Sequence, residues 1–334
     1  MNNKALISLA ITAYNEESVL EKLYERLVAT LAGVDFPFEI VIVDNGSSDR
    51  TLEILKGLHE QDPRLKYVSL SRNFGHQGGL VAAMEHCTGD AIISMDADLQ
   101  HPPELIPELI ARWQEGNRIV YTIKNEQKLS WPRATFNRAY YFSLSRLSGF
   151  DLGGGQSDFR LVDRHALDIL LALNEKNKFL RGLVKWIGFP QCAVSYDVAE
   201  RYRGTSKFST IDLWRFALDG LLSFSAIPIH VFSMIGLIAS ALSLLYFGFV
   251  MAVWIGVSFF GVNQNILPLG WSSLAAGVFF IGGVQLIGIG LLGEYLARIF
   301  DEVKNRPTYL VQEKASGLKT EKSATVGGPG SSEG

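Results

Sequence analysis

Two aspartates, Asp96 and Asp98, stand one residue apart at the end of the short apolar run Ala91 to Met95. The run predicts a buried strand, which Pro102-Pro103 cannot extend. In open α/β sheets, ligands bind beyond the carboxyl ends of the strands. Because neighbouring carboxylates repel each other unless they share a cation, and Mg²⁺ and Mn²⁺ prefer oxygen ligands, the pair predicts a site for a metal ion and a diphosphate. A pair of solvated loop aspartates is the alternative.

The segments before this pair repeat one pattern of strand, polar turn and helix. The predicted strands are Leu6 to Ala13, Phe38 to Val43 and Leu65 to Leu70. This alternation predicts a doubly wound, mostly parallel α/β sheet whose polar turns share one edge. There we expect Asp44 to hold a base or ribose, and Asn15 to cap the first helix, although such residues are also ordinary turn formers.

Several function classes are not supported. The chain has neither a Gly-x-Gly-x-x-Gly after its first strand nor a Gly-x-x-x-x-Gly-Lys-Ser/Thr, which argues against a dinucleotide oxidoreductase and a P-loop enzyme. A net charge of -3 over 334 residues does not favour nucleic acid as a partner. The two cysteines show no metal-ligand spacing.

A long stretch from Val231 to Gly293 contains no Asp, Glu, Lys or Arg. Within it, Val231 to about Phe260 and Trp271 to about Leu292 are each long enough to cross a hydrocarbon core of about 30 Å. Because Lys and Arg flank the two spans but are absent from the link between them, both termini are predicted to be cytoplasmic. A buried helical hairpin in a soluble core is the alternative.

Four motifs together point to a known family. They are Tyr14-Asn15-Glu16-Glu17, Val43-Asp44-Asn45-Gly46-Ser47-Ser48-Asp49-Arg50-Thr51, Asp96-Ala97-Asp98-Leu99-Gln100-His101-Pro102 and Gly204-Thr205-Ser206-Lys207. The chain resembles the inverting family 2 glycosyltransferases of GT-A fold up to about Arg306. Within them it is similar to the polyprenyl-phosphate sugar transferases, most of all the bactoprenol glucosyltransferases, with the aminoarabinose transferases and dolichol-phosphate mannose synthases as relatives.

The resemblance implies a role for each matching residue. It implies that Mg²⁺ or Mn²⁺ binds to Asp96, Asp98 and Gln100, and that the nucleotide binds to Tyr14, Glu16, Asp44, Asp96 and Ala97. The catalytic residues it implies are Asp98, Asp158, Arg201 and Lys207, and the acceptor-phosphate residues are Lys124, Arg133, Arg138, Ser206 and Lys207. Whether Asp158 is a base, a positioning group or a turn cap stays open.

Three positions depart from the family pattern. Thr12 stands where the family usually has Pro, Asn45 where a second Asp is common, and Lys124 where Arg is frequent. Lys124 therefore offers a point charge in place of a bidentate fork.

The resemblance, the apolar stripe after residue 210, the charge-free stretch and the composition from Lys314 onward together predict a division of the chain into four parts. These are a cytoplasmic catalytic domain at 1–210, an interfacial amphipathic helix at 211–228, two transmembrane helices with a short periplasmic link at 229–300, and a cytoplasmic, mostly disordered tail at 301–334. Residues 131–148 fit either a second interfacial helix or a helix on the core. Glycines in the second span allow close packing between subunits of a homo-oligomer or within one subunit.

The implied activity is inverting transfer of a hexose to polyprenyl (undecaprenyl) phosphate in a bacterial inner membrane, with UDP-glucose favoured as donor. An aminoarabinose-type or mannose-type donor is the first alternative. A processive polysaccharide synthase would need a Gln-x-x-Arg-Trp motif, and Leu109 stands where its Gln should be. A non-catalytic nucleotide-binding membrane scaffold is the alternative from a different class.

Overall fold

The computed structural model describes residues 4–124, 156–173, 175, 178–197, 271–316 and 318, with separate positions between 229 and 255. The chain divides into two compact units. One combines Met1–Arg146, Phe150–Phe208 and Pro307–Gly334, and the other combines Leu147–Gly149 and Ser209–Arg306. The predicted domain at 1–210 is therefore completed by residues from the end of the chain.

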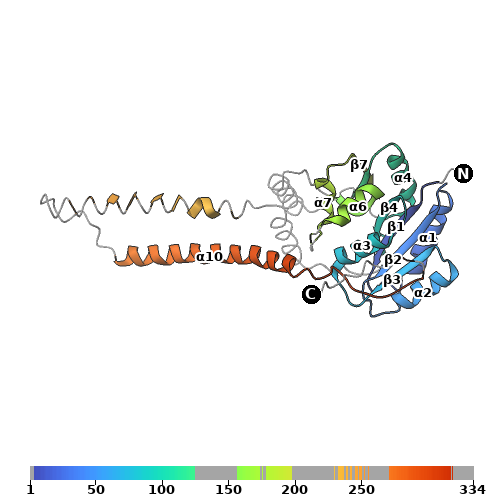
Figure 1. The fold of residues 1–334 in the computed structure, drawn as a ribbon, viewed down its shortest axis with the longest axis horizontal. Helices are drawn as coiled ribbons and strands as arrows, with labels where there is room; N and C mark the ends of the chain where they lie inside the picture. The colour runs from blue at the N-terminus through green and yellow to red at the C-terminus, as the bar shows by residue number, and fades with distance from the viewer. Residues whose placement is uncertain are drawn as a thin grey trace, which may run out of the picture. The chain divides into compact units, whose positions relative to one another are not determined.

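In the described part of the chain, eight strands form one sheet in the order β7-β5-β6-β4-β1-β2-β3-β8. Figure 1 shows β4, β1, β2 and β3 as neighbours in this order. Their bounds are β1 Ile7–Ala13, β2 Phe38–Asp44, β3 Leu65–Leu70, β4 Ala91–Asp96, β5 Ile119–Lys124, β6 Gln156–Asp163, β7 Gln191–Tyr196 and β8 Val311–Lys314. Strand β1 pairs in parallel with β2 and β4, β2 with β3, and β5 with β7, whereas β6 and β8 run antiparallel to their neighbours. The predicted mostly parallel α/β sheet is confirmed.

Helices cover both faces of this sheet. Their bounds are α1 Leu20–Ala32, α2 Thr51–Gln61, α3 Gly75–His86, the short 3₁₀ helix η1 Pro103–Leu105, α4 Ile106–Gln114, α6 Arg164–Ala172 and α7 Leu180–Trp186. Buried side chains of α1, α2 and α4 join those of Ile7, Leu9 and Ile11 in one cluster. Each such side chain stabilises the fold by about 1.5–3 kcal/mol.

Helix α3 packs on the opposite face. Successive side chains of a strand alternate between faces, so Thr12 points away from the cluster that holds Ile11. A Cβ added to Gly79 of α3 would lie 2.4 Å from Thr12 Oγ1. This close approach holds the start of α3 against the ends of β1 and β2.

The topology brings the predicted site residues to one edge. Strands β1 to β4 are parallel, so Ala13, Asp44, Leu70 and Asp96 all end at that edge. Strand β6 begins there, because its antiparallel register pairs Arg160 with Ser94.

The edge strand β8 lies within the predicted tail at 301–334, where no strand was expected. Val311–Lys314 pairs with β3, Ser71 N donates to Leu310 O at 3.0 Å, and Ala315 N donates to Tyr67 O at 2.9 Å. Tyr309 and Ala315 are buried, and the Tyr309 hydroxyl donates to Glu85 of α3. The composition that predicts disorder begins at Lys314, and the residues from 319 onward lie outside the described residues, so the disorder of that part stays a prediction.

One helix among the described residues is long and apolar enough to cross a membrane. Helix α10 spans Trp271–Val303, and its candidate membrane segment is Ile281–Val303, with a mean hydropathy of 1.3. Apolar side chains such as Leu286 and Ile287 are about 70% exposed. The predicted second span, Trp271 to about Leu292, lies within this helix and overlaps the candidate membrane segment from Ile281 onward. Of the predicted first span only separate positions are described, and the helices predicted at 131–148 and 211–228 lie outside the described residues.

Removing β8 should expose the edge of β3. A chain ended after Arg306 lacks the carbonyl that accepts from Ser71 N, so we expect that amide to exchange its hydrogen faster and the unit that contains the sheet to aggregate more readily. Hydrogen exchange followed by mass spectrometry measures the first effect. A chain ended after Leu318 is the matched control, and equal Ser71 protection in both chains would show that β8 does not cover this edge.

Candidate active site at the carboxyl edge of the sheet

The buried carboxylate of Asp158 contacts several cationic side chains at this edge. Arg181 donates from Nε to its Oδ1 at 3.0 Å and from Nη2 to its Oδ2 at 2.7 Å. Arg160 Nη2 lies 3.2 Å from Oδ1, and His76 Nε2 lies 3.3 Å from Oδ2. Its backbone carbonyl accepts from Ser94 Oγ at 2.6 Å, which fixes Asp158 to β4.

This environment keeps Asp158 ionised. Burial by itself raises the pKa of the carboxyl group, but Arg181, His76 and Arg160 outweigh it and hold the pKa well below its usual range. A carboxylate with so low a pKa is a poor proton acceptor at neutral pH. The geometry therefore suits a group that positions its neighbours.

Asp96, at the end of β4, is in the opposite electrostatic situation. Burial raises its pKa, His76 lowers it, and Asp158 and Asp98 raise it further, with a result of about 6. Its Oδ1 is buried without a hydrogen-bond partner, and the nearest ion-pair contact of that atom is His76 Nε2 at 3.6 Å. Asp96 thus carries a charge that its surroundings compensate poorly.

A bound divalent cation would compensate the negative charge of Asp96. The unpaired Oδ1 of Asp96 and the neighbouring carboxylate of Asp98 are hard oxygen donors of the kind that Mg²⁺ and Mn²⁺ bind. Gln100, half-buried, donates its backbone N–H to Asp98 Oδ1 at 3.1 Å. Within the described ranges, no group of three or more His, Cys, Asp or Glu side chains is arranged as a complete ligand set.

A buried hydrogen-bond chain fixes the aspartate loop from behind. His101 Nδ1 accepts from Asp96 N at 3.0 Å, and Nε2 lies 2.7 Å from Ser157 Oγ, which also accepts from Tyr196 at 3.2 Å. Burial lowers the pKa of His101 to about 3, so its ring is neutral and Nε2 carries the proton. The ring stacks on Phe159 with centroids 5.3 Å apart. His101 therefore ties β4, β6 and β7 together at the site.

The turns after β1 and β2 are joined to each other. Ser48 N donates to Asn15 Oδ1 at 2.8 Å, and Glu16 N donates to Thr51 Oγ1 at 2.9 Å. Helix α1 begins at Leu20 and has no side-chain cap, so the prediction that Asn15 caps it is wrong. Asn15, whose φ is 54°, instead bonds the turn after β2 through Ser48. Local sequence does not reveal this interaction.

Asp44 anchors the second of these turns. It is buried, with Oδ1 accepting from Ser47 N at 3.0 Å and Oδ2 from Ser69 Oγ at 2.9 Å. Tyr14, in the turn after β1, is 38% exposed. Ala97, which follows β4, is buried.

The structure thus brings every candidate that it describes to one edge. Those placed at the carboxyl edge are Tyr14, Glu16, Asp44, Asp96, Ala97, Asp98, Gln100, Lys124 and Asp158. The remaining candidates, Arg133, Arg138, Arg201, Ser206 and Lys207, lie outside the described residues.

Sequence reasoning missed Arg160, Arg181 and the roles of His76 and His101. His76 and His101 follow strands β3 and β4 in the polar turns, so their position was a usable signal. Arg181 opens α7 with no motif around it.

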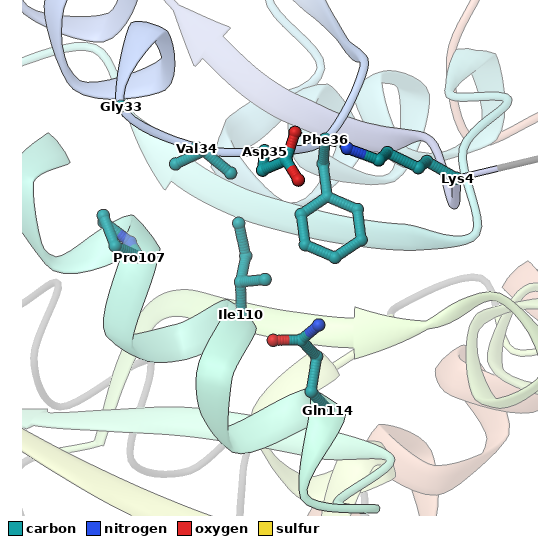
Figure 2. Close-up of a pocket in the computed structure, with 8 residues that line it drawn as sticks. All are labelled: Lys4, Gly33, Val34, Asp35, Phe36, Pro107, Ile110 and Gln114. Carbon is teal, nitrogen blue, oxygen red and sulfur yellow. Dashed lines mark hydrogen bonds and ion pairs between the residues drawn. The ribbon is translucent and has the colours of Figure 1, made fainter. Parts of the chain in front are cut away.

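A separate hollow lies at the opposite edge of the sheet. It has a volume of about 380 Å³ and is lined by Lys4, Gly33, Val34, Asp35, Phe36, Pro107, Ile110 and Gln114 (Figure 2). Phe36 and Ile110 approach each other across it, and Lys4 pairs with the exposed Asp35. The hollow lacks a convergent set of titratable groups like the one at the carboxyl edge.

Comparison with known proteins gives a consistent result. Residues 8–171 match the family model Glycosyl transferase family 2. An uncharacterized glycosyltransferase of Synechocystis is 40% identical over 92% of this chain and 95% of its own length. The bactoprenol glucosyl transferase of Shigella phage SfII is 36% identical over 93% of this chain and 99% of its own. Among solved structures, glucosyl-3-phosphoglycerate synthase of Mycobacterium tuberculosis has a TM-score of 0.45 at 21% identity, over 66% of this chain and 79% of that one.

Replacing Arg181 with alanine should destabilise the protein in a pH-dependent way. A carboxyl group with a lowered folded-state pKa stabilises the fold above its unfolded pKa of about 3.9, and that contribution is lost as the pH falls through the folded-state value. We expect a loss of at most about 3–5 kcal/mol at neutral pH, because Arg160 and His76 remain, and a smaller difference from wild type in acid. Denaturation midpoints of wild type and variant, at neutral and at acidic pH, measure the two differences in stability. Arg112→Ala, which removes an exposed ion pair, is the control; a pH-independent loss for Arg181→Ala would contradict the assignment.

Replacing His101 with phenylalanine should loosen the aspartate loop. The ring can still stack on Phe159, but the buried N–H of Asp96 loses its acceptor, at a cost of about 1–3 kcal/mol. Chemical denaturation of the detergent-solubilised protein measures the change. His165→Phe, at an exposed histidine of the opposite edge, should leave stability unaltered, and equal stability of both variants would rule out this role for His101.

Proposed function

Because the chain belongs to glycosyl transferase family 2, we propose that it moves a hexose from a nucleotide sugar to the phosphate of a membrane polyprenol, with inversion at the anomeric carbon. The observation that carries this proposal is the uneven compensation of charge at the carboxyl edge, where Asp158 is saturated with cationic donors and Asp96 is not. Glucose from UDP-glucose and undecaprenyl phosphate are the substrates we favour, supported by the name of the Shigella phage relative.

On the donor side, Asp96, Asp98 and Gln100 would hold Mg²⁺ or Mn²⁺. When bound, such a cation supplies positive charge to the departing diphosphate. Tyr14, Glu16 and Ala97 would contact the nucleotide. Asp44 would act mainly by fixing the turn that receives it, since both of its oxygens already accept hydrogen bonds.

On the acceptor side, the nucleophile needs placement more than deprotonation. A phosphate monoester is already ionised at neutral pH. The low pKa of Asp158 therefore favours a positioning role, in which it orients Arg160 and Arg181 toward the reacting groups. Lys124, which lowers the pKa of Asp96, and the residues Arg133, Arg138, Arg201, Ser206 and Lys207 are proposed to bind the acceptor phosphate or close over it.

The membrane segment supports a lipid acceptor. Helix α10 offers an exposed apolar segment of 23 residues. We place the enzyme in the bacterial inner membrane, with two spans and the catalytic unit on the cytoplasmic face, where a lipid phosphate can reach the aspartates. A homo-oligomer is compatible with the glycines of α10.

Asp98→Ala should abolish transfer while membrane insertion stays intact, because the cation site would lose one of its two carboxylates. Transfer is measured with labelled nucleotide sugars and undecaprenyl phosphate in detergent, with insertion judged by membrane fractionation. Asp35→Ala, at an aspartate of the opposite edge whose side chain is 89% exposed, is the matched control.

The same assay separates the competing functions. Turnover by Asp98→Ala, or turnover undiminished by a chelator, would contradict the proposed site. A wild-type protein that transfers no sugar from any donor would favour the non-catalytic scaffold, and preference for another nucleotide sugar would replace UDP-glucose.

A further inference from the structure

His76 lies between the carboxylates of Asp158, whose charge is compensated, and Asp96, whose charge is not. Its Nε2 lies 3.3 Å from Asp158 Oδ2 and 3.6 Å from Asp96 Oδ1. The side chain is 39% exposed, whereas that of Asp158 is 4% exposed. An incoming molecule that bridges Asp96 and Asp158 therefore meets the imidazole ring of His76.

We propose that His76 contacts the transferred hexose and selects among donor sugars. The inference rests on the proposed function, in which the diphosphate lies at Asp96 and Asp98 and the acceptor attacks on the side of Asp158. The sugar joins these two positions, so it must lie in the interval that His76 borders.

The ring has the chemistry for this contact. Asp158 is ionised and can only accept, so Nε2 of His76 carries the proton that faces it. Nδ1 has no hydrogen-bond partner among the described residues and can face a sugar hydroxyl. A polar group can hydrogen-bond a hydroxyl that one epimer presents to it and the other epimer does not. Because the second epimer leaves the polar group without a partner, the group discriminates between the two sugars.

Asn45 holds His76 in place. Its Oδ1 accepts from Phe74 N at 3.0 Å, and its Nδ2 donates to Gly75 O at 2.9 Å, so both residues before His76 are fixed to the end of β2. A Cβ on Gly46 would lie 2.4 Å from the carbonyl carbon of Arg72, which shows how closely the two turns pack.

This contact gives a physical reason for the amide at position 45. An aspartate there could accept from Phe74 N but could not donate to Gly75 O, and its charge would repel that carbonyl. Asn45 is thus a positioning residue that acts through His76.

Donor selectivity tests the proposal. The specificity constant kcat/KM is measured with UDP-glucose, UDP-galactose and UDP-N-acetylglucosamine for wild type, His76→Ala and His76→Gln. We expect His76→Ala to change at least one donor ratio by about tenfold, and His76→Gln, which keeps polar atoms near the same position, to restore part of it. The Kd for UDP, which lacks the sugar, should stay the same. His165→Ala, at the opposite edge, should alter neither the ratios nor the Kd.

The Asn45→Asp variant tests the positioning step. It should shift the same donor ratio in the same direction as His76→Ala, by a smaller factor. Unchanged selectivity in Asn45→Asp would overturn the role of Asn45.

The outcomes distinguish this inference from the proposed function. If His76→Ala lowers kcat/KM for every donor by one factor, or weakens UDP binding to the same extent, His76 is a structural partner of Asp158 and the sugar contact is overturned. If the wild-type protein transfers no sugar at all, the proposed function fails first, and this inference fails with it.

Discussion

The carboxyl edge of the sheet gathers Asp44, Asp96, Asp98 and Asp158, and the need to compensate their negative charge determines which side chains surround them. Asp158 receives two guanidinium groups and an imidazole, which keep it ionised inside the protein. Asp96 receives a distant imidazole and keeps one oxygen unpaired. The carboxylates of Asp96 and Asp158, on the adjacent strands β4 and β6, therefore differ. The charge of Asp158 is compensated by its neighbours, whereas the charge of Asp96 would be compensated by a bound cation.

The scaffold supports this contrast with hydrogen bonds from several directions. The neutral ring of His101 accepts a hydrogen bond from Asp96 N and so fixes the loop after β4. The hydroxyl of Ser94 donates to the carbonyl of Asp158 and so fixes the start of β6. Asn45 ties the turn before α3 to the end of β2. Such bonds join strands that are distant in sequence, so the edge is assembled only when the whole sheet has formed, and its groups are then held close to one geometry.

Local pattern was enough to predict the parallel strands β1 to β4, but not β5 to β8 or the full site. Apolar runs and turn residues gave β1 to β4 nearly to the residue, and Asp96 was located because it ends such a run. Arg181 carries no pattern, since its role depends on a carboxylate 23 residues away. Asn15 was misassigned because a helix cap and a clamp between turns use the same residue type. Strand β8 was missed because four residues beside a low-complexity tail carry little periodicity.

The position of β8 in the chain has a consequence for biosynthesis. Ribosomes make proteins from the amino terminus, so the sheet acquires its last strand only after the apolar stretch of α10 has been translated. Until then the outer side of β3 stays uncovered, with Ser71 lacking its acceptor. The unit that contains the sheet is therefore completed only after the apolar segment of α10 has left the ribosome.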